Sequence, residues 1–274
     1  MLRYLLRNIA IVSLKLAMRQ QGLWGMYGNL LKIVPNIANQ STTVPVRTGY
    51  IRLKIRATHA FQVKLMAKAL ELVGNTNPVG VVDIGDNTGT HTLYIKALSR
   101  KTLNCTSVDM DSNAIQRIKS LGLSAICGRA EDVTYPPDTQ IFMIFAMLEH
   151  LPNLTEFLYK LSKEPHCKSL IISVPYLRQS RVGLRHIRLG QKRVVSAEDV
   201  HIYEISPDDW RLIFKHSGWA VAYDRVFYQY PRRIPLISWL LSCFWKRNDF
   251  EGFYGAVLTP DDTWSKLYKD WNNK

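Results

Sequence analysis

The stretch Val81-Val82-Asp83-Ile84-Gly85-Asp86-Asn87-Thr88-Gly89-Thr90 decides the fold class of this 274-residue chain. Apolar residues run into Asp83, and two glycines follow, separated by three polar residues. A glycine turn after a strand lets backbone N–H groups approach a ligand without intervening Cβ atoms. The spacing differs from the G-x-G-x-x-G of dinucleotide binders, and no Gly-Lys-Ser/Thr follows, so pyrophosphate is not the expected ligand.

Strands and helices alternate on both sides of this stretch. The pattern predicts strands at 79–84, 106–109, 125–127, 141–146, 170–174, 221–228 and 253–258, and helices at 61–72, 91–98, 112–121, 154–161 and 207–217. This order predicts an α/β fold with a doubly wound, mostly parallel, seven-stranded Rossmann-like sheet and a basic helical N-terminal extension. We place the extension and its linker at residues 1–56. The sheet domain follows at 57–274, with inserts at 176–200 and 229–250.

Composition is that of a globular protein, with 47% hydrophobic and 21% charged residues. The four cysteines show no paired spacing, which argues against a disulfide framework or a zinc site. A reducing, cytoplasmic compartment fits this usage best.

Positive charge is concentrated near the N-terminus. The formal net charge is +14, and no Asp or Glu precedes Glu71. This asymmetry indicates either a polyanionic partner, nucleic acid or an anionic membrane face, or a solvated basic arm.

Two segments combine apolar and basic residues without the length of a membrane span. Residues 1–20 carry leucines at helical spacing among arginines and lysines, with no signal-peptide cleavage site. This pattern predicts either a helix on the inner face of the cell membrane or a helix packed on the protein's own body. Residues 230–247 enclose a short apolar core between basic pairs. They indicate a second membrane contact or, alternatively, a homodimer interface.

Six motifs in sequence order resemble those of class I S-adenosylmethionine-dependent methyltransferases, over roughly residues 60 to 260. They are VVDIGDNTG (81–89), SVDMD (107–111), GRAEDV (128–133), FAMLEHLPN (145–153), SLIISVPY (169–176) and HIYEISPDDW (201–210). The resemblance implies that S-adenosylmethionine is the cofactor.

The same resemblance assigns the cofactor's contacts. Backbone amides of the loop, with Asp83 or Asp86, would hold its carboxylate and ammonium groups, and Asp109 its ribose hydroxyls, with Asp111 as the alternative. The adenine would contact the backbone of Ala130 and the side chain of Glu131. The full predicted cofactor-binding set is Asp83, Gly85, Asp86, Asn87, Gly89, Asp109, Met110, Ala130, Glu131 and Ala146. The chain departs from the family pattern at Asp86, often Cys, and at Arg129, commonly Asp.

His150 and His201 are the candidate general bases, because both belong to the predicted mouth of the site. Either one is alternatively a structural histidine. We expect no metal site, because Ala146 stands where a metal-binding family of RNA-end methyltransferases has a Glu.

The acceptor is expected to be a hydroxyl of an anionic or lipid-linked glycan. Residues 173–193 carry five arginines and one lysine without an acid, which suits phosphate or carboxylate recognition. They and the late DFEGFYG motif resemble bacterial methyltransferases associated with surface-polysaccharide assembly. RNA methylation is the alternative, but the chain lacks the Asn/Asp-Pro-Pro-aromatic motif of enzymes that act on base amines.

Overall fold

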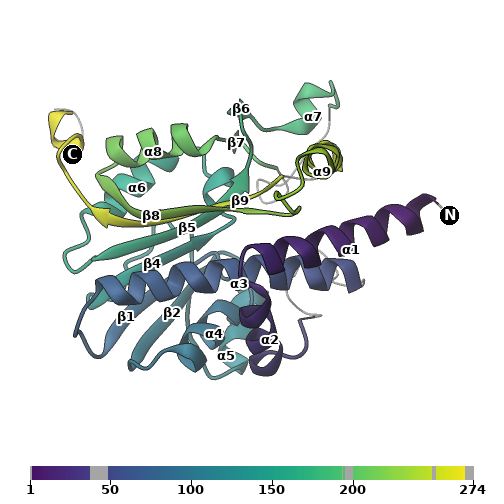
Figure 1. The fold of residues 1–274 in the computed structure, drawn as a ribbon. Coiled ribbons are helices and arrows are strands. Elements are labelled where there is room, and N and C mark those ends of the chain that lie inside the picture. The colour runs from purple at the N-terminus through teal and green to yellow at the C-terminus, as the bar shows by residue number, and fades with distance from the viewer. Residues whose placement is uncertain (1, 38–48, 193, 195–199, 249–250, 269–274) are drawn as a thin grey trace.

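A computed structural model gives the fold of the chain (Figure 1). It describes residues 2–37, 49–192, 194, 200–248 and 251–268, without the side chains of residues 2, 3, 185, 247 and 248. Arg193 of the arginine-rich stretch and the first two residues of the DFEGFYG motif lie outside this range. The principal helices are α1 (Leu2–Gln20), α2 (Trp24–Ile33), α3 (Gly49–Leu72), α4 (Thr90–Leu98), α5 (Ser112–Ser120), α6 (Leu154–Ser162), α7 (Arg185–Arg188), α8 (Pro207–His216) and α9 (Pro235–Asn248).

The main sheet has seven strands in the order β3-β2-β1-β4-β5-β9-β8. They are β1 (Val79–Ile84), β2 (Leu103–Asp109), β3 (Ser124–Cys127), β4 (Thr139–Phe145), β5 (Ser169–Tyr176), β8 (Trp219–Tyr228) and β9 (Gly252–Pro260). Strands β1 to β5 are parallel, whereas β9 is antiparallel to both of its neighbours. The predicted fold class is therefore confirmed. A two-stranded ribbon of β6 (Arg181–Val182) and β7 (Tyr203–Glu204) stands apart from the main sheet.

Helices cover both faces of the sheet (Figure 1). On one face, α3 and α4 contribute Phe61, Leu65, Tyr94 and Ile95 to a core that also contains β1 and β4 side chains. On the other face, α6 and α8 supply Phe157, Leu158, Trp210 and Phe214 to a second core. Because both faces are buried, the carboxyl edge of the parallel strands is the place where loops can build a site.

The N-terminal extension packs on the domain. One side of α1, with Ala10, Leu14, Ala17 and Met18, is buried, so the predicted packing on the protein's own body holds for that side. The Nε1–H of Trp245 donates to Ser13 Oγ at 3.1 Å and thereby joins α9 to α1. None of the described helices is long and apolar enough to cross a membrane.

Arg56 accounts for the difference between the predicted and observed start of α3. This basic residue is buried, and its guanidinium donates to the carbonyl oxygens of Leu30 and Val34 at 2.9 and 2.7 Å. Leu30 lies in the last turn of α2 and Val34 is its cap residue, so Arg56 supplies donors to the end of that helix, where carbonyls lack a full set of helical partners. The helix begins at Gly49 rather than near Phe61, and the predicted domain boundary between residues 56 and 57 lies inside it.

Candidate active site

The glycine loop between β1 and α4 has the backbone that its sequence predicts. Gly85 and Gly89 adopt φ angles of +77° and +73°, and Asn87 also has a positive φ of 57°. A Cβ at Gly89 would lie 2.8 Å from Leu123 Cδ1, and one at Gly85 would lie 3.2 Å from Met147 Cγ. The loop is therefore closed to larger residues at both glycine positions, and its amides stand at the carboxyl edge of the sheet.

Two buried carboxylates lie beneath this loop. Asp86 Oδ2 accepts a hydrogen bond from Ser107 Oγ at 2.5 Å, while Asp83 Oδ2 and Asp86 Oδ1 are buried without a hydrogen-bond partner. Burial, followed by the charge of Asp86, holds the pKa of Asp83 well above its ordinary value. Burial likewise raises the pKa of Asp86 to about 6. Such a pair is suited to receive a cation.

His91 completes this buried cluster and was not predicted. Its Nε2–H donates to Gln62 Oε1 at 3.0 Å, and its Nδ1 lies 3.6 Å from Asp83 Oδ2. Burial lowers the pKa of His91 to about 3, so the ring is neutral. No sequence signal indicated Gln62, because this residue reaches the cluster from α3, far from any motif.

Asp109 lies at the tip of β2, where a ribose-binding acid is predicted. Its Oδ2 accepts from the Asn87 amide at 2.9 Å, and its Oδ1 accepts from the Asp111 amide at 2.8 Å. The alternative residue, Asp111, instead caps α5 by accepting from the Asn113 amide. The carboxylate of Asp109 is thus fixed against the glycine loop, whereas that of Asp111 serves a helix N-terminus.

The predicted adenine side lies next to Asp109. Met110 is one of the exposed large hydrophobic residues. The carbonyl of Ala130 accepts from Tyr135 Oη–H at 2.6 Å, and Glu131 pairs with Arg129 Nη2 at 3.2 Å. The apolar side chain of Met110 and the carboxylate of Glu131, which is paired with Arg129, therefore border the position predicted for the adenine.

The turn after β4 brings strained backbone to the same edge. Ala146 has a φ of +52° although it is not glycine, and its amide donates to the Ser173 carbonyl at 2.7 Å. Strain of this kind is characteristic of functional sites. The predicted strand stops at Phe145, one residue early, because Ala146 leaves the extended conformation there.

His150 and His201 lie together, with ring centroids 5.0 Å apart. The Nδ1–H of His150 donates to the Val200 carbonyl at 2.8 Å, and His201 Nδ1 lies 3.6 Å from Glu204 Oε1. The Ile202 amide donates to the Glu149 carbonyl at 2.8 Å and joins the two segments. The structure thus unites two candidates that are 51 positions apart in the sequence.

Two glutamates in contrasting environments flank His201. Glu149 is fully buried with neither carboxylate oxygen hydrogen-bonded, and burial raises its pKa to about 7 despite the nearby His201. Burial also acts on Glu204, but hydrogen bonds from His201 and Arg181 outweigh it and lower the pKa to about 2. The ionised Glu204 orients the His201 ring, as a carboxylate does beside a catalytic base. Glu204 was quoted in a motif but not predicted as functional.

The same cluster has the spacing of a cation site. Ligand atoms of Glu149, His150 and His201 lie within 4.8 Å of one another. Three ligands of these types are enough to hold a divalent ion that keeps an open coordination position.

Arginines of the insert after β5 are partly engaged with acids. Arg181 and Arg188 both approach Glu204, and Arg178 Nε lies 3.6 Å from Glu251 Oε2. Residues 173–193 contain no acid, but their arginines meet acids from elsewhere in the chain. Its arginines remain partly exposed, so each still presents donors to solvent.

Solved structures share this architecture. The 1,6-didemethyltoxoflavin-N1-methyltransferase of Burkholderia thailandensis, solved with S-adenosylhomocysteine, is 12% identical with a TM-score of 0.53, over 76% of this chain and 81% of that one. The magnesium protoporphyrin IX methyltransferase of Synechocystis PCC 6803, solved with S-adenosylmethionine, is 12% identical with a TM-score of 0.52, over 85% of this chain and 97% of that one. An S-adenosylmethionine-dependent methyltransferase of Leishmania major is 14% identical with a TM-score of 0.52, over 85% of this chain and 83% of that one.

The chain has the class I methyltransferase fold. No sequence-family profile matches it, and no curated protein matches it in sequence. Methyltransferases of this fold differ widely in their acceptors, as the names of the Burkholderia and Synechocystis enzymes show. The acceptor must therefore be inferred from this chain's own residues.

Proposed function

We propose that the protein is an S-adenosylmethionine-dependent methyltransferase that methylates a hydroxyl of a glycan or glycolipid precursor for a cell-surface polysaccharide, at the inner face of the membrane. The observation that carries this proposal is the His201–Glu204 pair, which the Ile202–Glu149 hydrogen bond joins to the turn after β4 at the carboxyl edge of the sheet. A hydroxyl must lose its proton during methyl transfer, and an oriented histidine can accept it.

The described residues fit the cofactor. The unpartnered oxygens of Asp83 and Asp86 suit its ammonium group, whereas the Gly85 amide already donates to the Val108 carbonyl at 2.8 Å. Asp109 would accept hydrogen bonds from the ribose hydroxyls. When bound, S-adenosylmethionine supplies an electrophilic methyl group on a sulfonium.

His201 would act as the general base. Its Nδ1–H faces the ionised Glu204, so Nε2 is the nitrogen that can accept the acceptor's proton. The positive charge that then develops on the ring is stabilised by Glu204, as by the acid of a catalytic triad. His150 lacks a carboxylate in this position, since its Nδ1 faces a backbone carbonyl.

The anionic character of the acceptor rests on the insert after β5. Arg178, Arg181 and Arg188 lie on the segment that leads from β5 to His201, and their charges suit a phosphate or a carboxylate. RNA is the second candidate acceptor, favoured by the net charge of +14.

A transfer assay with radiolabelled S-adenosylmethionine tests the proposal on nucleotide sugars, lipid-linked glycans and RNA. We expect label in an anionic or lipid-linked glycan, in an ether that resists alkali. Label in RNA alone would select the second candidate, and no label in any class would contradict both. Repeating the assay with a chelator distinguishes two mechanisms. Turnover that survives the chelator supports proton abstraction by His201, and turnover that is lost supports chemistry assisted by a cation on Glu149, His150 and His201.

Cofactor binding is expected to weaken as the pH falls through about 6. The ammonium group favours the ionised form of Asp86, whose pKa is raised to about 6, so binding is strong above that pH and is lost below it. Calorimetry with S-adenosylhomocysteine should give about tenfold lower affinity one pH unit below the pKa of Asp86 than well above it. Asp86→Asn should bind weakly with a flat profile, while Asp208→Asn, at an exposed position on α8, should keep the wild-type profile. A steep profile in Asp86→Asn would exclude this carboxylate as the cause.

Gly183→Ala is expected to lower turnover without changing cofactor affinity. The new Cβ would lie 1.7 Å from the His201 carbonyl oxygen, so the backbone that carries the proposed base must shift. A displacement of about 1 Å can cost roughly a hundredfold in rate. Single-turnover kinetics measures the loss, and Gly28→Ala, where a Cβ meets nothing within 4 Å, is the control. Unchanged turnover would show that the position of His201 does not matter.

A further inference from the structure

The outer side of α1 is a continuous apolar stripe. Leu5, Ile9, Val12 and Leu16 recur at helical spacing and are exposed, with Val12 at 55%. They lie apart from the buried side that packs on the domain, so this helix has two apolar sides and only one is covered within the described chain.

Helix α9 repeats this arrangement. Trp245 is buried, and Leu241 and Phe244 pack against the core. By contrast Leu236 and Trp239 are 69% and 61% exposed, and Ile237 and Leu240 are also exposed. The Trp245–Ser13 hydrogen bond joins α9 to α1, so the two exposed sides lie on connected helices.

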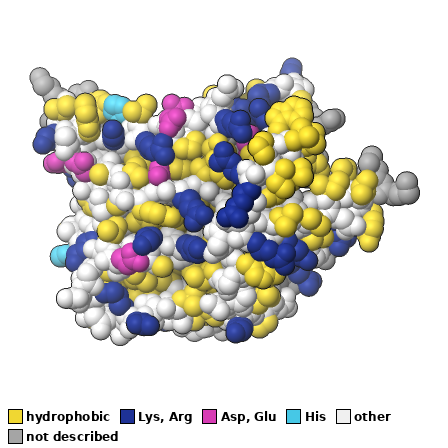
Figure 2. Space-filling model, viewed as in Figure 1, with side chains coloured by type: hydrophobic (Ala, Val, Ile, Leu, Met, Phe, Trp, Pro, Cys, Tyr) yellow, Lys and Arg dark blue, Asp and Glu magenta, His cyan; other side chains and the backbone are white. Residues whose placement is uncertain are grey.

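Positive charge surrounds these apolar sides. Neither the first 70 residues nor residues 225–248 contain an Asp or Glu. Figure 2 shows Lys and Arg side chains gathered beside the hydrophobic ones over α1, α9 and the edge of the sheet. An apolar strip bordered by basic residues is the composition of segments that lie in the headgroup region of a membrane.

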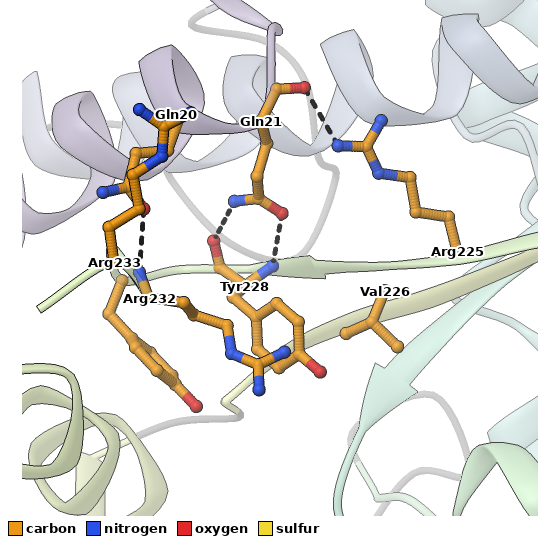
Figure 3. Close-up of a pocket in the computed structure, with 8 residues that line it drawn as sticks. Gln20, Gln21, Arg225, Val226, Tyr228, Arg232 and Arg233 are labelled. Atoms are coloured by element: carbon orange, nitrogen blue, oxygen red, sulfur yellow. Dashed lines mark hydrogen bonds between the residues drawn. The ribbon is translucent and has the colours of Figure 1, made fainter. Parts of the chain in front are cut away.

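A basic pocket lies between the end of α1 and strand β8 (Figure 3). It has a volume of about 310 Å³, and it is lined by Gln20, Gln21, Arg225, Val226, Tyr228, Tyr230, Arg232 and Arg233. The Arg232 guanidinium lies 4.2 Å from the centroid of the Tyr228 ring. Arg225 Nη2 donates to the Gln21 carbonyl at 3.1 Å. Both guanidiniums are therefore held in place, and three arginines line a pocket whose positive charge suits a phosphate.

We propose that α1, α9 and this pocket form one surface that docks on an anionic phospholipid bilayer. The exposed side chains of α1 and α9 enter the headgroup–acyl boundary, and the arginine pocket receives a lipid phosphate. Trp239 suits that boundary, because its ring is apolar and its indole N–H is polar. The lipid is identified by its chemistry: a phosphate headgroup in a surface of net negative charge.

Charge favours a bilayer over a second copy of the chain. A two-fold dimer would place the same patch against itself and bring its arginines together. An anionic leaflet instead neutralises them. The inference deepens the membrane location given in the proposed function by naming the surface and the lipid chemistry, and it does not depend on which acceptor is methylated.

The docking surface lies on the same side of the molecule as the proposed acceptor site. In Figure 1, α7 of the arginine insert, α9 and the N-terminal half of α1 gather at one side. The insert adds exposed apolar residues of its own, Val182, Ile187 and Leu189. A docked molecule would thus turn this side toward the lipid surface.

Vesicle sedimentation tests the proposal with the full chain. We expect binding to phosphatidylcholine vesicles that contain phosphatidylglycerol, and little binding to phosphatidylcholine alone or at high salt. Val12→Glu with Leu236→Glu, and separately Arg232→Gln with Arg233→Gln, should each lower the partition coefficient by about tenfold or more. Leu212→Glu on α8 and Arg100→Gln with Lys119→Gln are matched changes at exposed positions elsewhere. They should bind as wild type does.

Three outcomes would overturn the inference. The first is that the Val12/Leu236 variant binds vesicles as well as wild type does. The second is that the pocket binds inorganic phosphate while the protein does not bind vesicles. The third is that wild type does not bind vesicles but forms a dimer, which the Val12/Leu236 variant disrupts. Trp239→Phe supplies a second readout, since it should remove much of the vesicle-induced blue shift of tryptophan fluorescence. Calorimetry with S-adenosylhomocysteine on the same samples measures cofactor binding. A loss of vesicle binding can therefore be distinguished from a failure of the proposed methyltransferase function.

Discussion

Replacing His201 with alanine is expected to reduce turnover by about 10²- to 10⁴-fold, the range typical of a lost general base. The ring lies between the ionised Glu204 and the buried Glu149, and its backbone is held against the insert after β5. Cofactor affinity should stay unchanged, because the glycine loop and Asp109 hold the cofactor. Single-turnover transfer to the acceptor found in the assay panel measures the loss.

Related variants make this prediction specific. Glu204→Gln should lower turnover less than His201→Ala, because it removes the orienting charge and leaves the base. His150→Ala should also lose less, and His166→Ala, at an exposed position before β5, should lose nothing. Full turnover in both His201→Ala and His150→Ala would mean that the reaction proceeds by positioning alone.

Asp109→Ala is expected to lower the affinity for S-adenosylhomocysteine by roughly tenfold or more, the loss typical of hydrogen bonds to a charged group. The same change removes the acceptor for the Asn87 and Asp111 amides, so the glycine loop also loses its anchor to β2. Calorimetry measures the affinity, and circular dichroism checks that the fold persists.

Asp111→Ala is the matched control for this change. It removes the N-cap of α5 and should lower the free energy of unfolding by about 1 kcal/mol. Its effect on cofactor affinity should be small. If Asp109→Ala binds as tightly as wild type while Asp111→Ala does not, the ribose-binding role moves to Asp111.

Most of the fold could be predicted because its signals are local. Strand β1 was predicted with its observed bounds, since Val79–Ile84 is an unbroken buried run between turn residues. Helix α8 begins where Ser206 and Pro207 place its cap and first turn, and Ser206 Oγ accepts from the Asp209 amide. Helix α2 and the first half of α3 were not predicted. In the first half of α3, buried polar residues such as Arg56 and His59 interrupt the apolar pattern.

The site was predictable only in its cofactor half. Asp109 and the glycines lie in motifs next to strand ends, so their position follows from the fold. Glu204 lies only three residues after His201, but the other partners of His91 and His201 come from tertiary packing. Gln62 reaches its histidine across the interface of α3 and α4, and the buried state of Glu149 depends on the whole second core. No local sequence signal encodes such contacts.

The ribbon of β6 and β7 has a consequence for how the protein distinguishes acceptors. Arg181 lies on one strand and pairs with Glu204 on the other, and the Leu184 amide donates to the His201 carbonyl at 2.6 Å. An acceptor anion that draws Arg181 or Arg188 toward itself therefore acts on the carboxylate that orients the base. Discrimination between acceptors would then appear in the rate of the chemical step as well as in binding. A neutral analogue of the true acceptor should bind and yet react slowly, as an unproductive ligand.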